Sequence, residues 1–142
     1  MKVILWDFDG VIIDSMSIRD MGFRKIFKKF DVKLVDKLLE YHNLNGGLSR
    51  YHKIRYFFEK IIKKDTNTEE VSKYAEQFSI IMRSELIKKK YIINNTFNFI
   101  KDFHLKYHFH IVSGSDEKEL QYLCSMLDLS SFFITINGSP VE

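Results

Sequence analysis

The chain has 142 residues, of which 45% are hydrophobic and 15% aromatic, enough for one packed domain or a small core with an insertion. Its 22 basic and 19 acidic residues leave a net charge of +3, too balanced to indicate a nucleic-acid or membrane-surface partner. No apolar run approaches the roughly 18–20 residues of a membrane-spanning helix. With one cysteine, Cys124, and no signal-peptide pattern, we expect a cytoplasmic protein.

The first predicted element is a strand at residues 2–6, KVILW, which should carry apolar side chains on both faces, as inside a parallel sheet. Asp7 and Asp9 follow it and precede Gly10, so they are expected at the carboxyl end of the sheet, where open α/β sheets bind ligands. A first carboxylate can attack an electrophile, and one two residues later can move a proton. A divalent cation would relieve their mutual repulsion. The structural alternative is an Asx turn that ends the strand.

Residues 17–90 follow a helical period throughout, with no strand pattern between them. A break at residues 43–47, NLNGG, divides this stretch into earlier and later helices. In the later part, Thr66 with Glu69 could form a capping box ahead of the last helix.

The segment at 45–53, NGGLSRYHK, carries the most suggestive side chains of this helical stretch. Its glycines permit a loop that approaches the mouth of a site, where Arg50 or Lys53 could meet an anionic substrate. In the alternative, Ser49 caps the next helix, and Arg50 and Lys53 lie on the solvated face of that helix.

After residue 90, predicted helices and strands alternate along the chain. The expected elements are a helix capped by Asn95 or Thr96, a strand at 109–115, a helix begun by Asp116 and Glu119, and a strand at 132–136 closed by Asn137–Gly138. The order of elements predicts an open α/β sheet with a helical domain inserted after its first strand. Residues 1–16 and 91–142 would form the core, and 17–90 the inserted domain.

The strand ending IVSGSD, at 111–116, supplies the second candidate site. Ser113, Gly114 and Ser115 offer hydroxyl and backbone N–H groups between a strand and a helix, where phosphate often binds. Ordinary turn and helix-capping chemistry is the alternative for such a segment. The binding role is favoured because the two aspartates should lie at the same end of the parallel sheet as this segment.

The order of these motifs is similar to that of the haloacid dehalogenase (HAD) superfamily. DFDGVIID at 7–14, a helical insertion and a strand ending in VSGS resemble its phosphatase branch, in which a helical cap follows the first motif, as in phosphoglycolate-phosphatase-like proteins. The resemblance implies a Rossmann-like α/β core, with the helical insertion as a cap domain over the active site.

By this resemblance, Asp7 would be the nucleophile that forms an aspartyl-phosphate, and Asp9 would protonate the leaving oxygen and then help water attack. The Asp7 carboxylate and the Asp9 backbone carbonyl would bind Mg²⁺, while Ser113 and the Gly114 N–H would hold the phosphoryl oxygens. The implied function is a Mg²⁺-dependent phosphatase that hydrolyses a small phosphorylated metabolite.

Two alternatives stay open. A phosphomutase on the same scaffold would also use both aspartates, and a non-catalytic binding or regulatory module could keep the fold. Dehalogenase chemistry is disfavoured, because it attacks carbon, needs no metal and generally lacks the acid that Asp9 provides. A sugar-nucleotide transferase with an aspartate–x–aspartate metal site would give no role to the VSGS segment.

The family's later lysine and acidic pair, which complete its phosphate and metal sites, lie beyond the motifs found in this chain. We therefore expect the chain to be the N-terminal portion of a longer protein, with an incomplete core. The first strand would then leave an apolar edge through which the chain could self-associate.

The purified chain of residues 1–142 is accordingly expected to show little or no phosphatase turnover, because two of the four family motifs are missing. Phosphate release from simple esters, with and without Mg²⁺, measures this directly. Robust metal-dependent turnover that Asp7→Asn abolishes would contradict the expectation.

Overall fold

Three parallel strands form the sheet of the structure, which is a computed structural model that describes residues 1–140. The strands are β1 (Val3–Trp6), β2 (His108–Asp116) and β3 (Thr135–Ser139), in the spatial order β1-β2-β3. In the register of the first pair, Val3 lies opposite His108 and Trp6 opposite Ile111. The predicted α/β fold with a parallel sheet is therefore confirmed.

The last strand is displaced from its predicted position. It begins at Thr135 instead of residue 132, because residues Ser130–Phe132 form a 3₁₀ turn, η3. It also continues through Asn137 and Gly138, which were expected to close it. Gly138 is needed there because a Cβ on it would lie 2.5 Å from the Ser115 carbonyl oxygen, so no side chain fits between the two segments.

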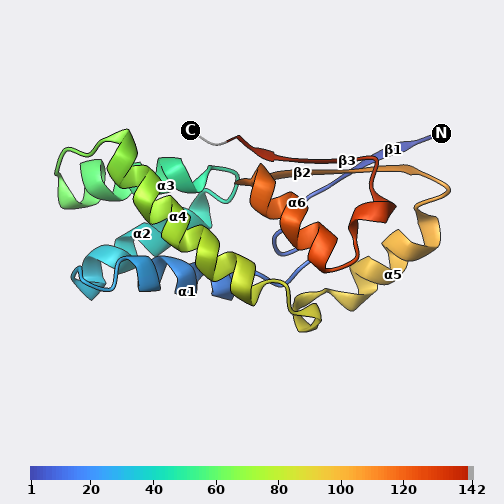
Figure 1. The fold of residues 1–142 in the computed structure, drawn as a ribbon, viewed down its shortest axis with the longest axis horizontal. Coiled ribbons are helices and arrows are strands. Elements are labelled where there is room, and N and C mark those ends of the chain that lie inside the picture. Colours follow the sequence, from blue (N-terminus) through green and yellow to red (C-terminus); the bar gives the residue numbers. More distant parts are fainter. Residues whose placement is uncertain (141–142) are drawn as a thin grey trace.

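Two helices cover one face of this sheet: α5 (Asn94–Phe103) and α6 (Glu117–Met126) (Figure 1). On that face, Phe109 of β2 is fully buried and its ring lies 5.4 Å from the ring of Trp6. The other face is uncovered within residues 1–140, and Val3 and Leu5 of β1 are 58% and 65% exposed. The first strand therefore has apolar side chains on both faces, as predicted, but only one of these faces is covered by helices within residues 1–140.

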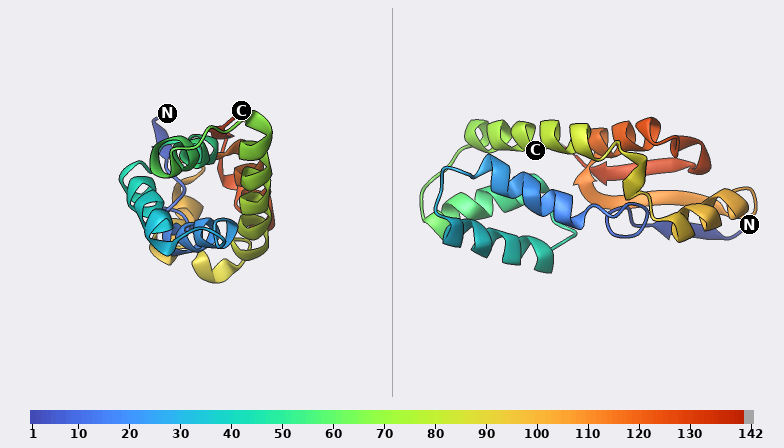
Figure 2. Two further views of the ribbon diagram at one scale, coloured as in Figure 1. Left: turned by 90° about the vertical axis from the view of Figure 1, so that its left-hand side faces the viewer. Right: turned by 90° about the horizontal axis from the view of Figure 1, so that it is seen from below.

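The remaining helices gather beyond the carboxyl ends of the strands (Figures 1 and 2). They are α1 (Met16–Ile26), α2 (Val32–Leu44), α3 (Arg50–Tyr56), its π-helical continuation η1 (Phe57–Ile62), and α4 (Thr68–Glu85). We call this group the helical insertion. A 3₁₀ turn, η2 (Lys89–Tyr91), leads from it back to α5. None of the helices in residues 1–140 has the length and apolar character needed to cross a membrane.

Aromatic side chains pack the interior of the helical insertion. The Phe27 ring, directly after α1, lies 4.2 Å from the ring of Phe57 in η1 and 5.0 Å from the ring of Tyr74 in α4. These contacts join three helical segments. Helices α1 and α4 approach closely at Gly22, where an added Cβ would lie 2.6 Å from the Met82 side chain. This packing gives the helical insertion an apolar centre of its own.

Helix starts agree only in part with the sequence signals. Ser49 caps α3 and Asp116 caps α6, each accepting a hydrogen bond from a backbone N–H three residues later. The capping box expected at Thr66 is wrong, because Asn67 caps α4 instead. Helix α5 begins at Asn94 with no side-chain cap, so the caps predicted after it are also wrong.

The position of β1 predicts how the chain self-associates. It is an edge strand with exposed apolar side chains, so another chain could pair along its backbone and pack beside Val3 and Leu5. Leu5→Lys places a charge on this surface and should reduce self-association, as measured by sedimentation velocity across a concentration series. Leu105→Lys, at another exposed leucine that lies outside the strands, is the control. Equal self-association of the wild type and Leu5→Lys would contradict the prediction.

Candidate active site

In the loop after β1, Asp7 and Asp9 flank a buried phenylalanine, Phe8. Phe8 between them is fully buried, whereas Asp7 is exposed. Gly10 has φ of 74°, a left-handed conformation that favours glycine, and its N–H donates to the Ile13 carbonyl at 2.8 Å. The Phe8 N–H donates to Asp7 Oδ1 at 2.7 Å. The tight turn therefore fixes both carboxylates at the carboxyl end of β1.

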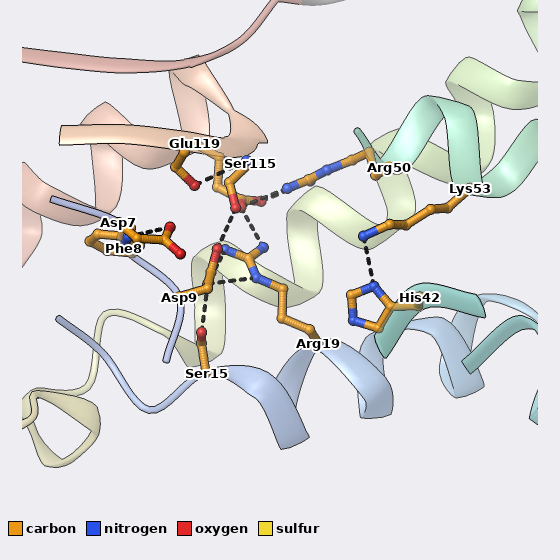
Figure 3. Close-up of polar contacts among 11 residues, drawn as sticks. Asp7, Phe8, Asp9, Ser15, Arg19, His42, Arg50, Lys53, Ser115 and Glu119 are labelled. Atoms are coloured by element: carbon orange, nitrogen blue, oxygen red, sulfur yellow. Dashed lines mark hydrogen bonds and ion pairs between the residues drawn. The ribbon is translucent and has the colours of Figure 1, made fainter. Parts of the chain in front are cut away.

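The Asp9 carboxylate is largely buried and receives donors on both of its oxygens (Figure 3). The Ser15 hydroxyl and the Arg19 Nε donate to Oδ1 at 2.5 and 3.0 Å. The Ser115 hydroxyl, from the end of β2, donates to Oδ2 at 2.6 Å. Burial raises the pKa of Asp9, but the Arg19 guanidinium and these hydrogen bonds outweigh burial and leave the pKa below its usual range. Asp9 is therefore ionised at neutral pH.

Arg19 and Arg50 of the helical insertion meet at Glu119 of helix α6. Arg50 donates through both terminal nitrogens to the two carboxylate oxygens, at 2.8 and 2.7 Å. Arg19 donates to the same carboxylate at 2.8 Å, and Glu119 is fully buried. Burial raises the pKa of Glu119, and the two arginines more than offset this, so the group stays ionised. The network carries two positive and two negative charges, counting Asp9.

A cavity of about 630 Å³ lies between the helical insertion and the ends of the strands, a volume typical of small-molecule sites. At Gly114 the cavity is narrow, because the Gly47 backbone lies directly against it. A Cβ added to Gly114 would lie 2.5 Å from the Gly47 carbonyl oxygen. Its lining includes every site residue predicted from the sequence, namely Asp7, Asp9, Ser113, Gly114, Arg50 and Lys53.

Lys53 and His42 form a second polar group in this cavity. The Lys53 Nζ lies 2.9 Å from His42 Nδ1, and both residues are buried. Burial, then the Lys53 charge, lowers the pKa of His42 to about 4. Burial, then the Arg19 charge, lowers the pKa of Lys53 to about 8. At neutral pH a charged lysine therefore donates to a neutral imidazole.

The structure also corrects two readings of the sequence. Arg50 and Lys53 do not lie on a solvated helix face, being 6% and 3% exposed, although Ser49 does cap their helix. Glu119 does not complete a capping box. Its N–H donates to Asp116 Oδ1, but its carboxylate binds the two arginines instead of returning to the start of the helix.

Arg19 and Glu119 belong to the site but were not predicted to act there, and the Ser115 hydroxyl, expected in the phosphate-binding segment, donates to Asp9. A sequence signal existed for Arg19, which falls on the buried stripe of α1 with Gly22, Phe23 and Ile26. A charged residue on an apolar helical face needs a buried partner, and that partner could not be identified from the sequence. Glu119 lies one hundred positions away along the chain.

Two oxygen donors beside the cavity could contribute to the binding of a divalent cation. No group of three His, Cys, Asp or Glu side chains within residues 1–140 is arranged to hold a metal ion. The Asp7 carboxylate is exposed at the cavity, however, and the Asp9 carbonyl accepts none of the backbone hydrogen bonds of its turn. Oxygen donors of this kind suit Mg²⁺, which usually keeps several waters and binds one or two carboxylates.

The fold and the site together define an α/β protein with a two-aspartate site beneath inserted helices. The family model described as haloacid dehalogenase-like hydrolase matches residues 4–140. The chain therefore belongs to the haloacid dehalogenase-like hydrolases. Comparison with curated proteins gives no match.

Solved structures support the same fold. β-Phosphoglucomutase (pgmB) from Clostridium difficile matches 95% of this chain at 24% identity, with a TM-score of 0.70. A CbbY variant from Rhodobacter sphaeroides, in complex with xylulose-(1,5)bisphosphate, matches 98% at 13% identity and a TM-score of 0.74. The candidate HAD-hydrolase YfnB from Bacillus subtilis, bound to magnesium, matches 97% at 14% identity and a TM-score of 0.69. This chain spans 60%, 64% and 65% of those three chains, respectively.

The buried carboxylate of Glu119 provides a stability test. Glu119→Gln leaves two buried arginines short of a counter-charge and should lower the free energy of unfolding by about 3–5 kcal/mol. Asp36→Asn, in the half-exposed Arg24–Asp36 ion pair, is the matched control and should cost less than about 1 kcal/mol. Urea denaturation measures both. A Glu119→Gln variant as stable as the control would show that the network is not a major constraint.

Proposed function

We propose that this chain carries the nucleophile half of a Mg²⁺-dependent phosphatase that hydrolyses a small phosphorylated metabolite through an aspartyl-phosphate. The observation that carries the proposal is the shared cavity: the exposed Asp7 carboxylate, the ionised Asp9 and the Ser113–Gly114 segment all line it. Family membership supports this assignment, and so does the magnesium bound by the structural neighbour YfnB.

In the first step, an Asp7 carboxylate oxygen attacks phosphorus, and the bond from phosphorus to the leaving oxygen breaks. Ser113 and the Gly114 N–H hold the phosphoryl oxygens during this transfer. Mg²⁺, held by the Asp7 carboxylate and the Asp9 carbonyl, would neutralise charge on the phosphoryl group. In the second step, water attacks phosphorus, which releases phosphate and restores the Asp7 carboxylate.

Asp9 is the proposed proton carrier of both steps. Asp9 is ionised and can accept a proton from the attacking water in the second step, although its lowered pKa makes it a weak base. Donation to the leaving oxygen in the first step requires Asp9 to be protonated, and the Arg19 contact opposes protonation. The acid role therefore requires that Asp9 release Arg19 during the catalytic cycle.

We propose residues 17–90 as a cap domain and residues 1–16 and 91–142 as part of the core. The helical insertion lies over the strand ends, and Gly47 meets Gly114 there, an arrangement suited to excluding water from the cavity. The proposed partner is a small phosphorylated substrate. The proposed location is the cytoplasm, in keeping with the single cysteine, Cys124, which is buried and unpaired.

The full-length product of the gene that encodes this chain should release phosphate from at least one ester of a metabolite panel, and only with Mg²⁺. Asp7→Asn removes the nucleophile and should lower kcat by at least about a thousandfold. Asp9→Asn should lower it by about 10²–10⁴-fold, the range of general acid–base catalysis. Asp14→Asn, at an exposed aspartate outside the cavity, is the control.

Three outcomes separate the candidate functions. Mg²⁺-dependent phosphate release that Asp7→Asn abolishes supports the phosphatase. Conversion of a sugar phosphate to its isomer, without net release of phosphate, would identify a phosphomutase instead. The absence of any metal-dependent reaction with every ester tested would contradict the enzyme and leave the non-catalytic module.

A further inference from the structure

The helical insertion is joined to the core by two segments that pair with each other. The Asp14 N–H donates to the Tyr91 carbonyl oxygen at 2.7 Å, and the Ile93 N–H donates to the Ile12 carbonyl oxygen at 2.9 Å. The chain therefore enters and leaves the insertion at one place. Such a connection can act as a hinge, because a few residues between elements can absorb the rotation of a whole domain.

Helices α1 and α3 carry two arginines that reach from the insertion to the core (Figure 3). Arg50 binds the Glu119 carboxylate through both terminal nitrogens, at 2.8 and 2.7 Å, and Arg19 binds it at 2.8 Å. Both helices pack against α4, so we expect them to move together. Rotation of the insertion about the hinge, away from α6, would therefore separate both guanidinium groups from Glu119.

Two further contacts between residues 17–90 and the core lie at the surface. The Lys89 Nζ is 3.2 Å from Asp128 Oδ2, and both side chains are largely exposed. The Arg83 guanidinium is 5.5 Å from the centre of the Tyr122 ring, in a residue that is 38% exposed. Exposed ion pairs and cation–π contacts contribute little, because water competes with them. The buried network is therefore the stronger link.

Glu119 also determines whether the closed arrangement is electrostatically favourable. Arg19, Arg50 and Lys53 all line the cavity and are all buried. Within residues 1–140, the carboxylates paired with these cations are Asp9 and Glu119, and Glu119 alone pairs with Arg50. Without Glu119, the closed cavity would hold three cations against one carboxylate, whereas an open cavity would let water hydrate them. Loss of the Glu119 charge should therefore favour the open arrangement.

We infer that Glu119 is a positioning residue that holds the helical insertion closed over the strand ends, with the paired segments at 12–14 and 91–93 as the hinge. The counter-charge that closes the insertion comes from the protein itself, so the closed arrangement should predominate before any substrate binds. In the alternative, a bound anion would have to supply that counter-charge. The role of Glu119 would be the same whatever reaction the site carries out.

Two spin labels can report how far the insertion lies from the core. Lys60→Cys in η1 and Lys118→Cys in α6 place the labels at exposed positions of the two parts. Cys124 is fully buried, and burial raises its pKa to about 12, so it should not react with the label. Double electron–electron resonance on the full-length protein, with any further cysteine replaced by serine, gives the distance distribution without ligand.

The labelled protein with Glu119 intact should show one main population, at the distance that the structure implies for the two labels. Glu119→Gln should add longer distances and raise the ratio of open to closed molecules at least about tenfold, the factor that corresponds to one charge-assisted hydrogen bond. Asp128→Asn makes the same change from carboxylate to amide in the exposed pair with Lys89 and should leave the ratio unchanged. Circular dichroism verifies that each variant is folded.

Arg50→Gln provides a second test if Glu119→Gln does not fold. It removes the two contacts from the side of the insertion, while Glu119 keeps Arg19 as its counter-charge. The label distances should therefore lengthen here too, though in a smaller fraction of the molecules. Arg24→Gln, in the half-exposed ion pair with Asp36 inside the insertion, is the matched control.

The distance distributions decide for or against the assignment. A closed population in the labelled protein and longer distances in the folded variants support it. A protein that is mainly open with Glu119 intact contradicts it, and so does a folded Glu119→Gln or Arg50→Gln variant with an unchanged distribution. None of these measurements depends on phosphate release, so failure of the proposed phosphatase activity would be seen separately.

Discussion

The fully buried Glu119 carboxylate is the contact on which the rest of the site depends. It accepts hydrogen bonds from Arg19 of α1 and Arg50 of α3, while its own helix, α6, packs on the sheet. One side chain thereby joins the helical insertion to the core at the edge of the cavity. Because unpaired buried charges are costly, the arginines and Glu119 stabilise one another only when the two parts are together.

This contact also determines the electrostatics of the two aspartates. Glu119 shares Arg19 with Asp9, so the guanidinium is held where it lowers the Asp9 pKa. Asp7 lies outside the network and remains exposed to the cavity. Two carboxylates two residues apart therefore have different surroundings, which fits the roles proposed for them, attack by Asp7 and proton transfer by Asp9.

Much of the architecture could be predicted from the sequence, because it depends on local patterns. The helical period of residues 17–90 indicated the helical insertion, and the DFDG and VSGS segments both lie at the carboxyl ends of strands of a parallel sheet. Predictions failed where neighbours along the chain compete. Asn67 caps α4 in place of Thr66, and β3 starts three residues late because η3 precedes it. The bare face of β1 depends on which helices pack against it.

The sequence by itself determined the fold class, the family resemblance and the residues at the strand ends, since strand alternation and parallel pairing bring those residues to one edge of the sheet. Only the tertiary structure decided how the charges are shared. Arg50 and Lys53 are three positions apart on one helix and looked equivalent in the sequence. Arg50 is neutralised by Glu119 and Lys53 is held by a neutral histidine, because long-range packing decides which buried charge finds a counter-charge.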